Sequence, residues 1–205
     1  MTLSAPEKKW VCVFCASAAG ASPTYLQAAN DLGHRIAQRG HGLVYGGATV
    51  GAMGAVADAA LAADGDVVGV IPDVIREREI DHKGLTELHV VRTMHERKAM
   101  LADRADAFVA LPGGYGTMDE FIEIVTWAQL KIHGKPCVLV NVNGFWNGLL
   151  AFLDHCVEQG MIYAENRTLV QVARDPEEAL QLIEQTWGER AEVPAHDARL
   201  DAVVR

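Results

Sequence analysis

Short apolar runs alternate with longer amphipathic segments along the chain. Runs of three to six residues at 11–16, 43–45, 66–71, 88–91, 107–111, 136–141 and 168–172 are typical of buried strands. Between them, the spacing of apolar residues predicts helices at 23–38, 51–63, 94–103, 117–131, 145–159 and 176–185. Ser22 and Pro23 are typical of a helix start and Gly40 of a helix end. The segment from Asp73 to Thr86 reads as a polar connection.

The expected strands are mostly apolar at successive positions, so helices should cover them on both sides. This pattern predicts an α/β fold of the Rossmann-like, doubly wound type, in which a parallel sheet has helices on both faces. We expect a single domain over residues 10–187. Residues 1–9 and 188–205 lose the periodicity and are expected to be flexible termini.

Composition narrows the class of protein. The 205 residues suit one hydrophobic core. No stretch is long and apolar enough to cross a bilayer, and the first ten residues lack the apolar core of a signal peptide, so we expect a cytoplasmic protein with no membrane partner. The net charge is −9 without any basic stripe, so nucleic acid is not an expected partner. The local cations at 76–78 and 97–98 favour a small anionic ligand instead.

Neither cysteines nor histidines indicate a metal site. Cys12 and Cys15 have C-x-x-C spacing, but they fall in a strand-like run where an odd separation places them on opposite faces. Zinc or redox chemistry is therefore the weaker interpretation, and buried free thiols in a reducing compartment are the stronger one. The eight histidines show no ligand spacing either. We expect no metal and no cofactor.

The first unusual loop, YGGATVGAMG, covers Tyr45–Gly54 and leads from a strand into a helix. Gly46 and Gly47 permit close backbone approach, and Gly51 and Gly54 lie where the helix begins. Free N–H groups and the helix dipole at such a start favour a phosphate group. The spacing is neither that of a dinucleotide fingerprint nor that of a P-loop. The alternative is that these glycines only allow a tight turn.

The second loop, LPGGYGTMDE, covers Leu111–Glu120 and also leads from an expected strand through glycines into an expected helix. Three glycines expose N–H groups, Thr117 is placed at the expected helix start, and Glu120 follows three residues later. Two interpretations of Glu120 stay open. Thr-x-x-Glu is the pattern of a capping box, in which Glu120 only stabilises the helix end. Alternatively, Glu120 is a catalytic carboxylate close to a phosphate.

A cation is available in MHERKAM, which covers Met94–Met100. Arg97 and Lys98 lie in the first turns of an expected helix, where positive charge opposes the helix dipole. A solvated surface pair is the alternative. Because this helix follows a strand, however, its start should lie at the same sheet edge as both glycine loops. The three segments therefore converge on one crevice.

Together, YGGATVGAMG, MHERKAM and PGGYGTMDE resemble the Lonely-guy family, with a similarity that runs from about Val11 to Phe152 through WAQLKIHGKPCVLVNVNGFWNGLL. The resemblance implies hydrolysis of the N-glycosidic bond of N6-modified adenosine-type nucleoside 5′-monophosphates, giving free base and ribose 5-phosphate. It implies that Arg97 and Glu120 are catalytic, and that the chain forms homodimers with sites near the interface. The substrate- and phosphate-binding residues that it implies are Gly46, Gly47, Gly51, Gly54, Glu79, Lys98, Gly113, Gly114, Tyr115, Gly116, Thr117 and Thr126.

Some points go beyond that pattern or depart from it. Ala48 and Ala52 replace a glycine and a leucine that are usual in the family. Arg97 is a poor proton donor because its pKa lies far above neutrality, which leaves Asp119 and His95 as weak candidates for protonating the departing base. An old lysine decarboxylase label of the family finds no support in the motifs. The rival function is a carrier that binds a nucleotide or a phosphorylated cofactor without chemistry.

Overall fold

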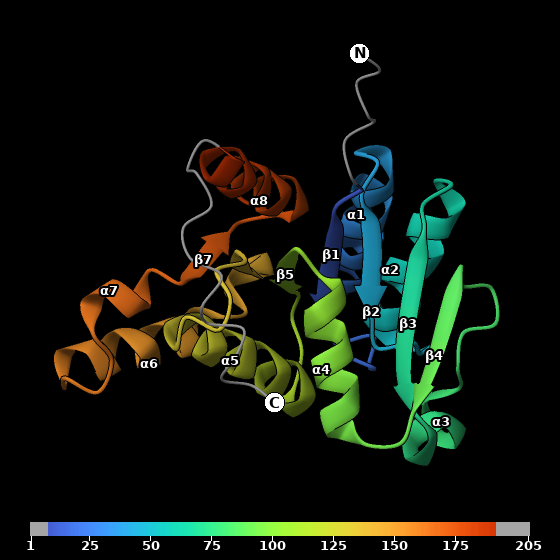
Figure 1. Cartoon of the computed structure of the whole chain (residues 1–205), viewed down its shortest axis with the longest axis horizontal. Coiled ribbons are helices and arrows are strands. Elements are labelled where there is room, and N and C mark those ends of the chain that lie inside the picture. The colour runs from blue at the N-terminus through green and yellow to red at the C-terminus, as the bar shows by residue number, and fades with distance from the viewer. Residues whose placement is uncertain (1–7, 192–205) are drawn as a thin grey trace.

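The computed structural model describes residues 8–191, apart from the side chains of residues 77–79, 190 and 191. Its strands form one parallel seven-stranded sheet in the order β4-β3-β2-β1-β5-β6-β7 (Figure 1). The strands are β1 (Trp10–Phe14), β2 (Gly42–Tyr45), β3 (Val67–Pro72), β4 (Glu87–Val91), β5 (Ala107–Ala110), β6 (Cys137–Val140) and β7 (Val170–Ala173). The strand order reverses between β1 and β5, and this switch point leaves a crevice at their carboxyl ends.

Burial follows position in the sheet. The inner strands β2, β3, β5 and β6 are buried at every residue, because helices cover both of their faces. The edge strands β4 and β7 contain exposed residues. In the centre, Val13 of β1 pairs with Tyr45 on one side and with Val109 on the other.

The helices form two layers around the sheet. They are α1 (Pro23–Gln38), α2 (Gly51–Ala62), α3 (Asp73–Glu79), α4 (Met94–Arg104), α5 (Tyr115–Gln129), α6 (Asn147–Glu158), α7 (Ala164–Arg167) and α8 (Pro176–Ala191), with a short 3-10 turn at Val142–Gly144. One core cluster joins α1, α2 and α8 to the sheet, and a second joins α4, α5 and α6 to its other face. Cys15 belongs to the first cluster and Cys12 to the second, on opposite faces as predicted. The predicted α/β, doubly wound fold is confirmed.

The residues at its two ends predicted the bounds of α1 correctly. Ser22 accepts a hydrogen bond from the N–H of Thr24, Pro23 occupies the first turn, and Gly40 follows the helix with φ of 73°. The prediction of a polar connection from Asp73 to Thr86 was wrong in part, because helix α3 forms within this segment. Its Glu- and Arg-rich sequence favours a helix without giving an apolar stripe. Helix α8 also continues to Ala191, past the predicted helix end at 185, and Glu189, Arg190 and Ala191 are residue types that favour a helix.

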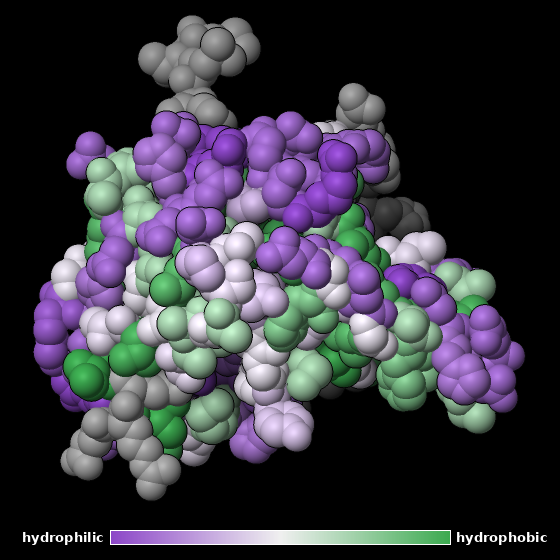
Figure 2. All heavy atoms as spheres, turned by 180° about the vertical axis from the view of Figure 1, so that it is seen from behind, coloured by the Kyte–Doolittle hydropathy of each residue, from purple (hydrophilic) through white to green (hydrophobic). Residues whose placement is uncertain are grey.

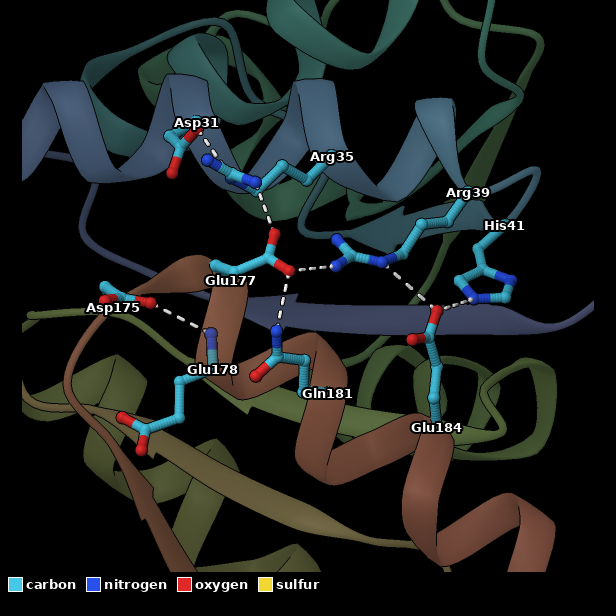
Figure 3. A network of polar contacts seen from close by, with 9 residues as sticks. All are labelled: Asp31, Arg35, Arg39, His41, Asp175, Glu177, Glu178, Gln181 and Glu184. Carbon is cyan, nitrogen blue, oxygen red and sulfur yellow. Dashed lines mark hydrogen bonds and ion pairs between the residues drawn. The ribbon is translucent and has the colours of Figure 1, made fainter.

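Helix α8 is attached to α1 by a network of charged side chains (Figure 3). Glu177 forms ion pairs with Arg35 and with Arg39, whose Nη2 lies 2.7 Å from Glu177 Oε1. Glu184 Oε1 lies 3.2 Å from Arg39 Nε and 3.1 Å from His41 Nε2. These contacts fix the last helix across the first one, away from the crevice between β1 and β5.

The surface differs between the two ends of the strands. On the back of the molecule, hydrophilic side chains gather toward the top of the view, and paler and hydrophobic ones are more frequent below (Figure 2). The carboxyl ends of the strands lie at the lower side (Figure 1). Across residues 8–191, the helices fall short of the length and apolar character needed to span a membrane.

Candidate functional site

A cavity of about 270 Å³ opens at the switch point, at the carboxyl ends of β1 and β5. Four segments build it: the loop after β1, the start of α2, the start of α4 and the first turns of α5. Its lining residues are Cys15, Ala16, Ser17, Ala18, Met53, Met94, Arg97, Gly114, Tyr115, Gly116, Thr117, Asp119 and Glu120. Six of the residues implied by the resemblance are therefore brought together in one place.

Arg97 and Glu120 form an ion pair in this cavity. Arg97 comes from α4 and Glu120 from α5, and Arg97 Nη2 lies 3.4 Å from Glu120 Oε1. Both residues are buried, at 6% and 8% exposure. Arg97 Nε has no hydrogen-bond partner among the described residues. A buried charge pair that lines a cavity is costly to maintain for stability alone, and such pairs are typical of functional sites.

The start of α5 separates the two interpretations of Glu120. The helix begins at Tyr115 with Gly114 at the N-cap position, where no side chain caps it. Thr117 is therefore the third residue of the helix. A capping box between Thr117 and Glu120 would require Thr117 at the N-cap position, and Gly114 occupies that position. The capping interpretation is wrong because the glycine turn is shorter than the sequence suggested. A capping arrangement does occur at α4, where Thr93 accepts from the N–H of Glu96 at 3.1 Å.

The first turn of α5 is available to an anion. The first intrahelical bond runs from Met118 N–H to Gly114 C=O at 3.0 Å, so the N–H groups of Tyr115, Gly116 and Thr117 precede the helical ladder. A side chain added at Gly114 or at Gly116 would meet open space. Thr117 is buried and lines the cavity, while Tyr115 is 91% exposed at its mouth. This geometry suits a phosphate group.

The first glycine loop has a different role. The N–H groups of Ala52 and Met53 at the start of α2 already donate to Ala16 C=O, at 3.1 and 3.3 Å. A Cβ on Gly51 would lie 2.3 Å from Ser17 O, and one on Gly54 would lie 2.1 Å from Thr49 O. Gly47 adopts a positive φ of 81° beside β3. These glycines make room for protein atoms, so the tight-turn alternative accounts for their geometry.

The two alanines that depart from the family pattern also pack inside the protein. Ala48 is fully buried, forms a bridge with Asp81 and accepts a hydrogen bond from the Tyr45 hydroxyl at 3.2 Å. Ala52 is buried in the core on the α2 side. Neither alanine lines the cavity described above.

Four other implied residues lie outside the lining of this cavity. Lys98 Nζ pairs with Asp119 Oδ2 at 3.3 Å and with Glu123 Oε2 at 3.1 Å, and these bonds raise its pKa although burial opposes the charge. Thr126 is exposed on α5 and donates to Ile122 C=O within its own helix at 2.8 Å. Gly113 lies in the wall of a neighbouring apolar hollow, where its missing side chain makes room for Thr117 Oγ1. The side chain of Glu79 lies outside the described residues.

The loop after β1 also belongs to the site, although it was not among the predicted site residues. Cys15 to Ala18 line the cavity together with Met53 and Met94. The sequence gives one sign of this, the small residues that follow the strand, but only the strand order places β1 at the switch point, where ligand-binding loops lie. The pKa of Cys15 is raised, mainly by burial and then by the charge of Glu120, so this thiol stays protonated and is not a nucleophile.

The two candidates for protonating a leaving group, Asp119 and His95, differ in their position relative to the cavity. Asp119 lines the cavity and is ion-paired with Lys98. His95 is exposed on the first turn of α4, outside the cavity lining. Of the two, only Asp119 lies within reach of a molecule bound in the cavity.

Comparisons with known proteins agree on a family. A family model described as "Possible lysine decarboxylase" matches residues 53–183. The cytokinin riboside 5′-monophosphate phosphoribohydrolase of Rhodococcoides fascians is 48% identical over 179 residues, which cover 87% of this chain and 90% of that protein. An enzyme of the same name from Arabidopsis thaliana is 43% identical over 187 residues, covering 91% of this chain and 85% of that protein.

Solved structures extend the likeness to another kind of protein. The molybdenum cofactor carrier protein of Chlamydomonas reinhardtii has a TM-score of 0.69 at 25% identity, covering 89% of this chain and 99% of the carrier. A molybdenum cofactor binding protein of Rippkaea orientalis, at 23% identity and a TM-score of 0.65, shows the shared fold alone. The match of the family model and the identity to the phosphoribohydrolases show that the chain belongs to this family, the Lonely-guy family that its three motifs resemble.

Proposed function

We propose that this protein hydrolyses the N-glycosidic bond of purine nucleoside 5′-monophosphates of the N6-modified adenosine type, giving free base and ribose 5-phosphate. One observation carries the proposal: a buried Arg97–Glu120 pair lines a cavity at the switch point, beside the uncapped start of α5. The relatives that are 43–48% identical are named for this reaction on cytokinin riboside 5′-monophosphates. A site that only binds a phosphate gains nothing from a carboxylate beside it.

The phosphate is assigned to the first turn of α5. The N–H groups of Tyr115, Gly116 and Thr117 and the positive end of the helix dipole favour a dianion there. Glu120 lies one turn further along the same helix, so a nucleotide held by its phosphate has its ribose next to that carboxylate. Substrate binding and bond cleavage therefore depend on consecutive turns of one helix.

The chemistry follows from charge. As the C1′–N bond breaks, its electron pair leaves with the base and positive charge develops on the ribose, as in glycoside hydrolysis. The Glu120 carboxylate stabilises that charge and orients the water whose oxygen bonds to C1′. The water loses one proton, and the base gains one at a ring nitrogen. Arg97 pairs with Glu120 and orients it, and its donors can also hydrogen-bond the departing base.

The rival is a carrier that binds without chemistry, and the likeness to the molybdenum cofactor carrier protein favours it. Identity weighs against it, at 25% to the carrier and 48% to the phosphoribohydrolase of Rhodococcoides fascians. The charge pair also weighs against it, because binding alone makes no use of a carboxylate beside the ribose, whereas cleavage of the C1′–N bond does.

We also propose a homodimer that uses the outer face of α5. The inner face of this helix is already used, because Phe121 and Ile124 are buried in the core of the subunit. Ile122 and Thr126 are exposed and lie on one face of the helix, with Leu130 exposed just beyond its end. If Thr126 contacts substrate, as the resemblance implies, it reaches the site of a second copy.

The test is incubation of the protein with AMP and with an N6-alkyl AMP, followed by chromatography for free base and ribose 5-phosphate. We expect both products in equal amounts with the wild type. Tight binding of AMP without any product would support the carrier. Appearance of base together with a ribosyl phosphate adduct other than ribose 5-phosphate would indicate transfer to an acceptor instead of water.

A further inference from the structure

Gly46 faces Arg97 and not the cavity. A Cβ built on Gly46 would lie 2.2 Å from Arg97 Nη2 and 3.0 Å from Met53 Sδ. Real Cβ atoms do not approach other atoms at the first of these distances. The backbone of Gly46 has no positive φ, so its conformation is one that alanine adopts without strain. What the protein requires at position 46 is the absence of a methyl group.

The nitrogen that occupies this space is the one that forms the ion pair. Arg97 Nη2 is both the atom over Gly46 and the atom 3.4 Å from Glu120 Oε1. Arg97 Nε has no hydrogen-bond partner among the described residues, so packing has a large part in placing this guanidinium. Gly46 directly follows β2 and begins the loop into α2, at the carboxyl edge where the cavity lies.

We propose that Gly46 is a positioning residue, which acts on the reaction by letting the Arg97 guanidinium lie against the backbone and face Glu120. This inference rests on the proposed function, in which the pair is catalytic. It differs from the role that the motif first suggested, in which the glycine lets the backbone approach a ligand. A methyl group at position 46 displaces Nη2 and misaligns the pair, and misplacement by about 1 Å in an active site costs roughly 10²-fold in rate.

The test is a double-mutant cycle of Gly46→Ala and Arg97→Ala, with Gly148→Ala as the matched control. Gly148 lies in α6, and an added Cβ there meets open space. We expect Gly46→Ala to lower kcat on AMP by about 10²-fold, with KM and melting temperature close to wild type. In the Arg97→Ala background the same change should have no further effect, because neighbours that act through one group are not additive. The control should keep wild-type kcat.

Three results would overturn the proposal. The first is an equal loss of kcat from Gly46→Ala in both backgrounds, and the second is a loss confined to KM, which a ligand-approach role would give. The third is a crystal structure of the Gly46→Ala variant in which Arg97 Nη2 keeps its position beside Glu120. The crystal structure needs no activity, so it decides the positioning role even if the wild type releases no base and the proposed function fails.

Discussion

Arg97 and Glu120 meet from two different helices, with 3.4 Å between Arg97 Nη2 and Glu120 Oε1. This distance exceeds the 2.7–2.9 Å of a close charge-assisted hydrogen bond. The contact is therefore an ion pair, in which each charge compensates the other without a short hydrogen bond between these two atoms. It belongs to the cavity lining, where the proposed reaction places the ribose.

The first prediction concerns Glu120→Gln, which keeps the shape and removes the charge. Because Glu120 is the sixth residue of α5, a capping role no longer competes with catalysis. We expect kcat on AMP to fall by about 10²–10⁴, the range for a positioned charged or acid–base group. KM should change much less, because the ribosyl charge appears mainly in the transition state. Steady-state kinetics on AMP measure both.

The Glu120→Gln variant needs a melting curve and a control. The loss of one charge-assisted contact of a buried arginine should lower the melting temperature by a few degrees, at roughly 2–4 °C per kcal/mol for a chain of this size. Glu158→Gln, at an exposed position on α6, should leave both kcat and melting temperature unchanged. A Glu120→Gln variant with wild-type kcat would remove the carboxylate from the mechanism.

A second prediction compares AMP with adenosine. In the proposed function the N–H groups at the start of α5 bind the phosphate, and binding energy from this remote group can be used at the reacting bond. Adenosine should therefore have a kcat/KM lower by on the order of 10²-fold or more, with kcat reduced as well as affinity. Product chromatography over a substrate series measures this ratio. Comparable kcat/KM values for the two substrates would place the phosphate elsewhere.

The fold could be predicted because the strands are apolar on both faces and the helices have clear start and stop residues. Ser22, Pro23 and Gly40 marked α1 at both ends. The sequence failed where a segment lacks an apolar stripe, as in α3, or where a glycine turn is shorter than expected, as before α5. These are choices of backbone geometry that residue types alone do not determine.

The site was predicted in part for a similar reason. Arg97 and Glu120 carry charge in unusual places, so residue type pointed to them. A glycine, by contrast, shows only that space is needed and not what fills it. Gly46 makes room for the Arg97 side chain, and Gly51 makes room for the backbone of Ser17. The sequence alone does not distinguish such glycines from glycines that let a ligand approach the backbone. Cys15 to Ala18 became visible only through the strand order.

The third prediction tests the dimer. Light scattering of the wild type should give twice the mass of one chain. Ile122→Glu places a charge on the exposed face of α5, and burying an unpaired charge in an interface is costly, so this variant should shift toward the monomer. Val74→Glu, at an exposed position on α3, is the control and should stay dimeric. A wild-type monomer mass that does not change with concentration would contradict the dimer.

The last prediction follows from the charged network between α1 and α8. The hydrogen bond from Arg39 is the main cause that lowers the pKa of Glu177 below its ordinary value of 4.5. A carboxylate with a lowered pKa in the folded state stabilises that state above its unfolded pKa, and this contribution is lost as the pH falls through the folded pKa. Acid should therefore loosen α8 before the sheet unfolds.

Hydrogen exchange measured at pH 7 and at pH 4 tests this. In the wild type, protection of the α8 amides should fall between the two pH values. In Glu177→Gln the fall should be smaller, because this variant lacks the Glu177 carboxylate at both pH values. Glu158→Gln should behave as the wild type does. Equal losses in the wild type and Glu177→Gln would show that Glu177 does not couple the docking of α8 to pH.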